Sequence, residues 1–143
     1  MEMPRPTKFH KKLEVFVGDW SGDETMYPVP WDPAGGSAKG RYKVRAAFDG
    51  FGVIQDYVQK RGGKTSYAGH GVMGYDPQAK CYIWHWSDTM GGVANAVTSG
   101  QWQGNKLTFQ HAGPMGHARY TYIIHKDATV GFTIDNSTDG DQW

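Results

Sequence analysis

Leucine is almost missing from this chain of 143 residues, where it occurs only as Leu13 and Leu107. A helical bundle needs many such residues for its core, so the shortage argues against one. Glycine is plentiful, with 20 residues, and phenylalanine, tryptophan and tyrosine together make up 14% of the chain. Glycine-rich turns and aromatic side chains are typical of β-sheet proteins, and we therefore expect an all-β fold.

Cysteine occurs once, as Cys81, which excludes an internal disulfide framework. The chain has no run of about 18 apolar residues and no apolar signal segment near its start, so neither membrane spanning nor secretion is expected. Its net charge of +1 gives no strong field to attract nucleic acid or a membrane surface. We expect one cytoplasmic domain over residues 1–143, without a nucleic-acid or membrane partner.

One helix is predicted, over residues 7–17, after a loose arm of residues 1–6 that contains two prolines. Thr7 is a suitable N-cap, and Gly18 can end the helix in the left-handed conformation. The apolar residues recur at i, i+4, i+7 and i+8, which predicts one buried stripe: Phe9, Leu13, Phe16 and Val17. Because the helix is short, we expect it to cover an apolar opening.

The remainder, residues 19–143, consists of short alternating segments separated by turn dipeptides such as Asp49-Gly50 and Gly104-Asn105. We predict strands over residues 19–27, 39–48, 53–60, 95–103, 106–110, 117–125 and 129–136, and two more in a hairpin within residues 67–90. A further reversal begins at Asp139-Gly140. Since no helices connect the strands, a parallel α/β fold is excluded. The pattern predicts a single up-and-down antiparallel β-barrel of about nine to ten strands, with room for a small ligand.

The hairpin contains the segment Gly69-His-Gly-Val-Met-Gly74, whose glycines match a dinucleotide-binding fingerprint. We reject that interpretation because the fingerprint needs a helix at its last glycine, whereas Asp76-Pro77 makes a turn. The glycines instead predict strong curvature of the sheet or the close approach of a neighbouring group.

The same hairpin carries two histidines whose relation depends on the turn. If the loop between Asp76 and Cys81 is even-numbered, His70 and His85 share one face, with Cβ atoms about 7–8 Å apart. The large rings then project from the other face: Tyr82, Trp84 and Trp86. An odd loop would place His70 with the tryptophans. Three roles are open for these two histidines: surface or structural groups, contacts to a ligand, or half of a metal site.

Other candidates lie at strand ends, which meet at the mouth of a barrel. Asp88 ends the hairpin, and His117 and Arg119 begin a later strand; such groups suit a ligand with an apolar body and a polar head. The simpler alternative is that Asp88 and Arg119 pair with neighbours. We assign no catalytic residue and no metal ligand, and predict these ligand-binding residues: His70, His85, Trp86, Asp88, His117, Arg119 and Tyr120.

Several of these residues fall in blocks that resemble a bacterial family catalogued as domain of unknown function 1579. The most distinctive blocks are Gly69-His-Gly71 with Gly74-Tyr-Asp-Pro77, His85-Trp-Ser-Asp-Thr-Met90, and Gly113-Pro-Met-Gly-His-Ala-Arg-Tyr120. The resemblance implies a lipocalin-like (calycin-type) barrel and no established activity. The helix followed by Gly18-x-Trp20-x-Gly22 is similar, more distantly, to nitrobindins and fatty-acid-binding-like barrels. Nitrobindins hold haem through a late histidine, but no motif around His117 or His125 matches.

Three functions are compatible with this sequence. The first is a binding module for a small apolar or amphipathic molecule, with the cofactor unknown. The second is a haem-dependent or histidine-based enzyme that uses the same cavity. The third is an interaction protein. The resemblance implies a further strand after residue 143, so either the sequence omits those residues or a partner closes the barrel. In the second case a homodimer would pair through the unfinished barrel edge.

Overall fold

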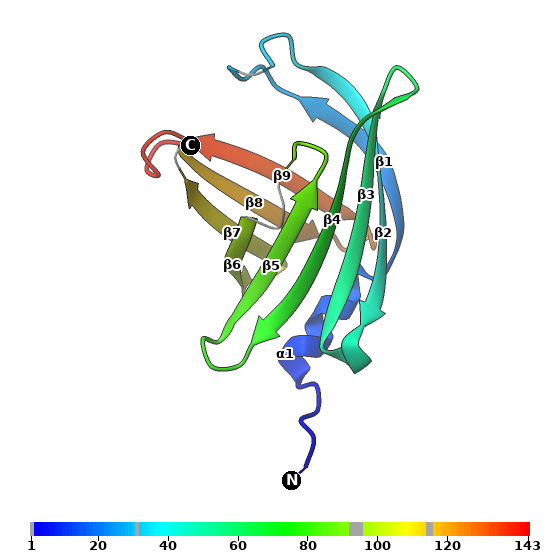
Figure 1. Cartoon of the computed structure of the whole chain (residues 1–143), viewed down its shortest axis with the longest axis vertical. Helices are drawn as coiled ribbons and strands as arrows, with labels where there is room; N and C mark the ends of the chain where they lie inside the picture. Colours follow the sequence, from blue (N-terminus) through cyan, green and yellow to red (C-terminus); the bar gives the residue numbers. More distant parts are fainter. Residues whose placement is uncertain (1, 31, 92–95, 114–115) are drawn as a thin grey trace.

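The computed structural model of the chain describes residues 2–30, 32–91, 96–113 and 116–143. A short helical segment precedes a run of β-strands (Figure 1). The helical segments are α1 (Lys8–Lys11), η1 (Lys12–Phe16) and η2 (Phe48–Gly50). The strands are β1 (Gly18–Met26), β2 (Gly36–Ala47), β3 (Gly52–Arg61), β4 (Lys64–Asp76), β5 (Cys81–Asp88), β6 (Ala96–Gln103), β7 (Lys106–Gly113), β8 (Gly116–Ile124) and β9 (Val130–Ser137).

These strands form one antiparallel sheet in which each pairs with the next, in the order β1 to β9. The predicted up-and-down meander is confirmed, and most strand ends agree within three residues. The predicted start of β6 at Asn95 lies outside the described residues. Within the described residues no helix is both long and apolar enough to cross a membrane.

The sheet curls into a half-barrel, the name used below for strands β1 to β9 together. In Figure 1, β1 to β4 form one wall and β6 to β9 the facing wall, with α1 at one end between them. Among the described strands no ladder joins β1 to β9, so the sheet stays open there. Nine antiparallel strands leave β1 and β9 running in the same direction, so these two edges cannot pair antiparallel with each other.

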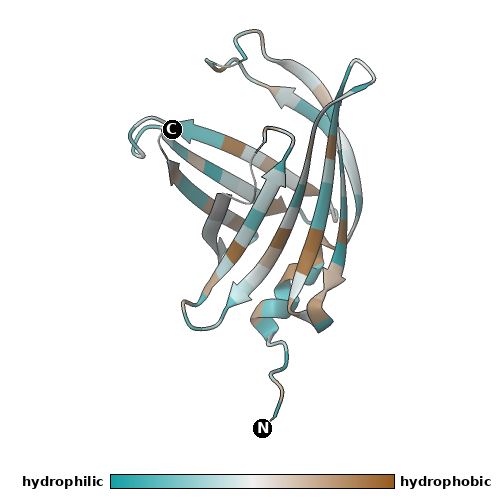
Figure 2. Ribbon diagram, viewed as in Figure 1, coloured by the Kyte–Doolittle hydropathy of each residue, from teal (hydrophilic) through white to brown (hydrophobic). Residues whose placement is uncertain are grey.

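Side chains alternate between the interior and the outer face of the half-barrel, as the pleat requires. Hydrophobic and hydrophilic residues are interspersed along the strands (Figure 2). In β2, Tyr42 and Val44 face inward, whereas Arg41 and Lys43 are exposed outside. This strand therefore presents apolar side chains to the interior and basic side chains to the outer face.

The helical segment begins as predicted but follows a different course. Thr7 is the N-cap, and its backbone N–H donates to Nδ1 of the buried His10 at 3.0 Å. Beyond Lys11 the chain continues as a 3₁₀ helix, which ends at Phe16. A 3₁₀ helix has three residues per turn, so Leu13 and Phe16 share the buried face.

The wider apolar stripe predicted for an α-helix was therefore wrong at both ends. Phe9 and Val17 are exposed. Phe9 lies in the α-helical turn, where its ring stacks on Tyr75 at the rim of the sheet, and Val17 follows the 3₁₀ helix in extended conformation. Gly18 already belongs to β1, and its φ of 150° is not that of a left-handed helical cap.

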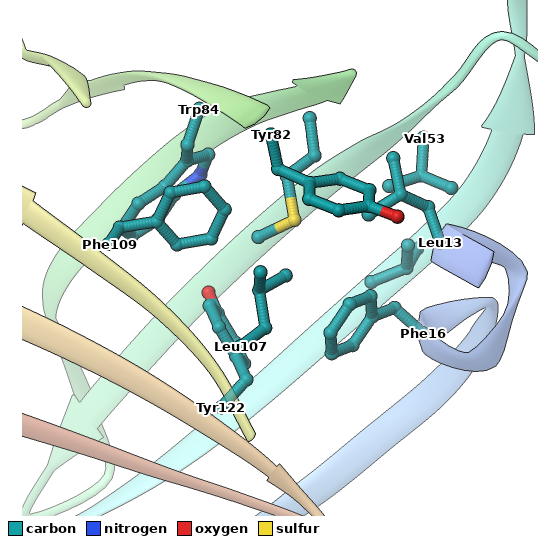
Figure 3. Packing of buried hydrophobic residues seen from close by; sticks show 10 residues of the cluster. Leu13, Phe16, Val53, Tyr82, Trp84, Leu107, Phe109 and Tyr122 are labelled. Carbon is teal, nitrogen blue, oxygen red and sulfur yellow. The ribbon is translucent and has the colours of Figure 1, made fainter. Parts of the chain in front are cut away.

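The core lies where the helical segment meets the sheet. Leu13 and Phe16 point into a cluster that includes Leu107, Phe109 and Tyr122 (Figure 3). Both leucines of the chain are 0% exposed, so they occupy its most buried positions. The helical segment thus fills one end of the half-barrel, as the sequence predicted.

Candidate functional site

The interior contains a small cavity above Phe16, between the wall of β1 to β4 and strands β8 and β9. Its free volume is about 40 Å³, enough for a few water molecules but far below the roughly 300–1,000 Å³ of most ligand pockets. A larger ligand therefore has to widen it. The lining is apolar apart from one amide and aromatic polar groups: Phe16, Trp20, Tyr42, Val44, Val53, Gln55, Met73, Tyr122, Val130 and Phe132.

Gln55 is the amide in this lining. Its side chain faces inward from β3, is only 3% exposed, and donates from Nε2 to the Tyr122 hydroxyl at 2.9 Å. Its Oε1 atom has no hydrogen-bond partner among the described residues. Trp84 Nε1 also lacks one, and a Cβ atom on Gly71 would lie 2.8 Å from Trp84 Nε1 and 3.0 Å from Gln55 Oε1. An unpaired acceptor and an unpaired donor thus flank the same glycine.

Two carboxylates also face the interior, nearer the open end of the half-barrel. The first is Glu24 of β1, whose two oxygens accept from the Tyr57 hydroxyl at 2.5 and 2.6 Å. Gln59 Nε2 donates to it at 2.9 Å. Gly40 lies on β2, between β1 with Glu24 and β3 with Tyr57. A Cβ atom at Gly40 would collide with the Glu24 carboxylate. The missing side chain therefore allows Glu24 to reach Tyr57.

The second interior carboxylate is Asp88 at the end of β5. Its Oδ2 atom accepts from the Tyr67 hydroxyl at 2.7 Å and from Trp86 Nε1 at 3.0 Å, and Trp86 Nε1 also lies 2.8 Å from that hydroxyl. Gly69 lies beneath this group, because a Cβ atom there would overlap the Trp86 ring. The predicted close approach of a neighbouring group is confirmed at Gly69 and Gly71 but not at Gly74, where a Cβ atom would lie 3.9 Å from the nearest atom.

Aromatic rings connect the two carboxylates. The ring of Tyr57 stacks on Tyr42 with centroids 4.4 Å apart, and its centroid lies 5.9 Å from Tyr67 and 6.4 Å from Trp86. Tyr120 of β8 approaches from the facing wall and lies 5.2 Å from Trp84. We call five of these rings the aromatic cluster: Tyr42, Tyr57, Tyr67, Trp86 and Tyr120.

The tyrosines of this cluster hold their protons more firmly than free tyrosine does. Burial raises the pKa of Tyr57 well above its usual value, and the hydrogen bond to Glu24 raises it further. Burial likewise raises the pKa of Tyr67, and its hydrogen bond to Asp88 raises that pKa further. For Tyr120, burial and the charge of Asp88 raise the pKa. These groups therefore act as neutral hydrogen-bond donors rather than as bases at ordinary pH.

Three of the predicted site residues belong to this interior: Trp86, Asp88 and Tyr120. Asp88 does pair with neighbours, as the simpler alternative held, but these are Tyr67 and Trp86 inside the half-barrel. The same pairing holds Asp88 at the open end of the interior.

His70 and His85 do not line the interior. The loop is even-numbered, since Asp76 pairs with Cys81 and Val72 with His85, so the predicted shared face is confirmed. That face is the outer one. The side chain of His70 is 53% exposed and lies 2.7 Å from Asp56 Oδ1, and His85 is exposed as well. The structure therefore places these two candidate ligand contacts outside the cavity, because the tryptophans occupy the inner side.

His117 and Arg119 also lie on the outer face, since strand β8 directs Tyr120 and Tyr122 inward. Arg119 forms a 3.5 Å ion pair with Asp135 and lies 4.4 Å from the centre of the Trp143 ring. His117 contacts the same tryptophan. Proximity in sequence suggested a common mouth, but adjacent strand residues point to opposite faces.

Four interior residues were not among the predicted site residues: Glu24, Gln55, Tyr57 and Tyr67. A usable signal was present in β3, where Gln55 alternates with Val53 and Tyr57 on the inner face. A glutamine between inward-facing apolar residues must be buried, so it needs a partner. Glu24 could not be found this way, because only the sheet places it beside Gly40. Among the described residues no group of three or more histidine, cysteine or acidic side chains could hold a metal ion.

Comparison with known proteins identifies a family for the chain. No curated protein matches the chain. The family described as protein of unknown function (DUF1579) matches residues 5–143. This match extends over nearly the whole half-barrel, including both interior carboxylates and Gln55. The chain therefore belongs to the DUF1579 family.

Proposed function

We propose that the half-barrel binds a small molecule with an apolar body and a polar head. The observation that supports this most is Gln55 Oε1, an unpaired acceptor on a side chain that is almost fully buried in the lining of a cavity. Leaving such a group without a partner costs about 1–3 kcal/mol. A ligand hydroxyl or amine that donates to it would remove this cost.

The path of the ligand follows from the order of side chains on β3. Val53, Gln55, Tyr57 and Gln59 face inward in succession, from the apolar base near Phe16 to the polar open end. We place the apolar body beside Val53 and the polar head between Gln55 and Tyr57. This arrangement requires the cavity to widen toward the open end.

Widening is possible at the open side of the half-barrel. Val130 and Phe132 of β9 line the cavity together with Trp20 and Tyr42. The rings of Tyr42 and Phe132 meet at 6.4 Å, and no ladder joins the two edge strands within the described residues. Separating these side chains breaks no strand hydrogen bonds, so it costs apolar contact only.

Binding is tested with 1-hexanol, whose hydroxyl can donate to Gln55 and accept from Trp84. Isothermal titration calorimetry should give saturable one-to-one binding, and thermal unfolding should shift upward as ligand is added. In Gln55→Leu we expect the affinity to fall about tenfold, since the head loses its acceptor. Gln110→Leu, on the exposed outer face of β7, should bind like the wild type. Absence of binding to the wild type would contradict the proposal.

A second proposal, pairing with another protein chain, is supported by the open edges of β1 and β9. Ile134 has the orientation of the inner residues of β9 and is nevertheless 53% exposed. Unpaired strand edges bind further strands readily. A second copy of this chain should then appear as a concentration-dependent dimer in size-exclusion chromatography with light scattering, weakened by Ile134→Lys. A monomer at all concentrations would argue against the homodimer.

A further inference from the structure

The charges that face the interior of the half-barrel are unevenly distributed. Glu24 and Asp88 are acidic, and both lie in the polar half of the interior. The basic residues of β2 point outward, for example Arg41, which pairs with Asp19. Arg61, at the end of β3, has the orientation of the inner residues and is paired with Asp32 at 2.9 Å. Lys64 of β4 is paired with Arg61 and shares this orientation, but it is exposed at the start of its strand. Among the described residues, neither Glu24 nor Asp88 forms an ion pair with a lysine or arginine.

Within the part of the chain that the structure describes, His111 is a further titratable nitrogen base with an inward orientation. It follows Leu107 and Phe109 on the inner face of β7, and it is half-buried. Neither carboxylate is bonded to it; Glu24 accepts from Tyr57 and Gln59, and Asp88 from Tyr67 and Trp86. The negative charges are thus held by neutral donors and are not cancelled by a cation.

Ring faces surround the same space. The aromatic cluster comes from five strands, with Tyr57 at its centre between Tyr42, Tyr67 and Trp86. Aromatic faces are electron-rich and attract cations, most strongly in sites that exclude water. Rings and carboxylates together therefore favour a positive group, and they disfavour the carboxylate of a fatty acid.

The buried acceptor of the cavity, Gln55 Oε1, also favours an ammonium group over a carboxylate. Gln55 Oε1 is unpaired and lies one inward-facing position below Tyr57 on β3. Tyr42 belongs both to the cavity lining and to the aromatic cluster, so the two are continuous. An ammonium N–H can donate to Gln55, whereas an ionised carboxylate has no proton to donate.

We infer that the ligand of this half-barrel is a small organic amine in its protonated form. The alkyl or aryl body occupies the apolar cavity, and the ammonium head lies between Gln55, the rings of the aromatic cluster and the two carboxylates. This inference rests on the proposed binding function and adds the charge of the head group. It also predicts discrimination against anionic amphiphiles of the same length.

Three probes with the same carbon skeleton test it: hexylammonium, 1-hexanol and hexanoate. At neutral pH and low salt, hexylammonium should bind about ten times more tightly than hexanoate, with 1-hexanol between them. Added salt should weaken hexylammonium binding and leave 1-hexanol unchanged. Equal affinities, or tighter binding of hexanoate, would overturn the inference while leaving the binding function intact. Failure of all three probes would contradict both.

Two interior variants test whether the carboxylates cause the preference for a cationic head group. Asp88→Asn and Glu24→Gln should each lower the affinity for hexylammonium about threefold or more and change that for 1-hexanol by less than about twofold. Asp56→Asn removes a carboxylate from the outer face, where Asp56 pairs with His70, and should alter neither affinity. If Asp56→Asn has the same effect as the interior variants, the inference fails. Circular dichroism of each variant checks folding, and the salt titration of the wild type gives a result that requires no variant.

Discussion

At the scale of single residues, glycines decide where the polar groups of the interior can meet. Gly40 leaves room for the Glu24 carboxylate on its way to Tyr57, and Gly69 leaves room for the ring of Trp86. Both glycines lie on strands that flank β3, one on each side. Residues without a side chain thus create the space in which the aromatic cluster and both carboxylates lie.

The variant Gly69→Ala tests this role. A methyl group at this position would overlap the Trp86 ring, and we expect a loss of about 1–3 kcal/mol in the free energy of unfolding. The tryptophan emission spectrum should also change, because the ring must move away from Asp88. Gly22→Ala is the matched control, since a Cβ atom there meets nothing within 4 Å. Equal stability of Gly69→Ala and the wild type would contradict the close packing.

The tyrosines give a prediction for alkaline pH. The pKa is raised for six of the eight tyrosines, mainly by burial: Tyr42, Tyr57, Tyr67, Tyr82, Tyr120 and Tyr122. Unfolding exposes these phenols, which then ionise near pH 10. Their contribution to stability is therefore complete below about pH 10 and is lost as the pH rises above that value.

Spectrophotometric titration at the phenolate absorbance band measures this behaviour. In the folded protein most of the phenolate signal should appear only together with unfolding, whereas in denaturant all tyrosines should titrate near pH 10. In Glu24→Gln we expect the pKa of Tyr57 to fall, because a neutral partner opposes phenolate formation less. Reversible titration of all tyrosines in the folded protein would contradict the buried arrangement.

At the scale of the element, the helical segment closes one end of the half-barrel. Only two of its apolar side chains, Leu13 and Phe16, reach the core, yet Phe16 also forms the floor of the cavity. The carbonyl of Phe16 accepts from Trp20 Nε1 at 2.7 Å, which fixes the segment against β1. The position of the cavity therefore depends on this short stretch.

Removal of the Leu13 side chain tests whether the helical segment fills this end of the half-barrel. Leu13→Ala should reduce the free energy of unfolding by about 2–5 kcal/mol, because a fully buried leucine leaves a cavity that its neighbours fill only in part. Val15→Ala, an exposed position on the same segment, should change stability by less than about 0.5 kcal/mol. Urea denaturation of both variants gives the comparison, and equal losses would show that the segment does not fill the end of the sheet.

At the scale of the whole molecule, the main feature is the sheet that curls without closing. Each inner strand has neighbours on both sides, whereas β1 and β9 each have one partner within the described residues. Side-chain contacts bridge the open side, such as that of Tyr42 on β2 with Phe132 on β9. This arrangement leaves the cavity free to widen, as the proposed binding of a ligand would require, because the free volume is about 40 Å³.

Hydrogen exchange monitored by mass spectrometry can measure how readily the edge strands β1 and β9 open. The amides of β1 and β9 should exchange faster than those of β3 and β4, because an edge strand loses its hydrogen bonds in smaller opening events. Ligand binding should slow exchange in β9 more than in β5, since Val130 and Phe132 line the cavity. Equal protection of edge and central strands at low protein concentration would indicate that the edges are covered.

The sequence alone determined the meander, its turns and the faces of its strands. These features depend on local chemistry: turn residues and a period of two fix each hairpin, and the even loop after Asp76 fixes the register of β4 and β5. For this reason Trp86, Asp88 and Tyr120 were identified among the candidate residues. The family resemblance was also visible in these segments.

Only the tertiary structure decided which face of each strand became the interior and which distant groups met there. Turn parity placed His70 beside His85, but the curl of the whole sheet directed both outward. Glu24, Gln55 and Tyr57 became neighbours of the cavity because glycines on adjacent strands left space for them. Such contacts join positions far apart in the chain, and no local pattern specifies them, because the packing of all nine strands decides where each side chain can go.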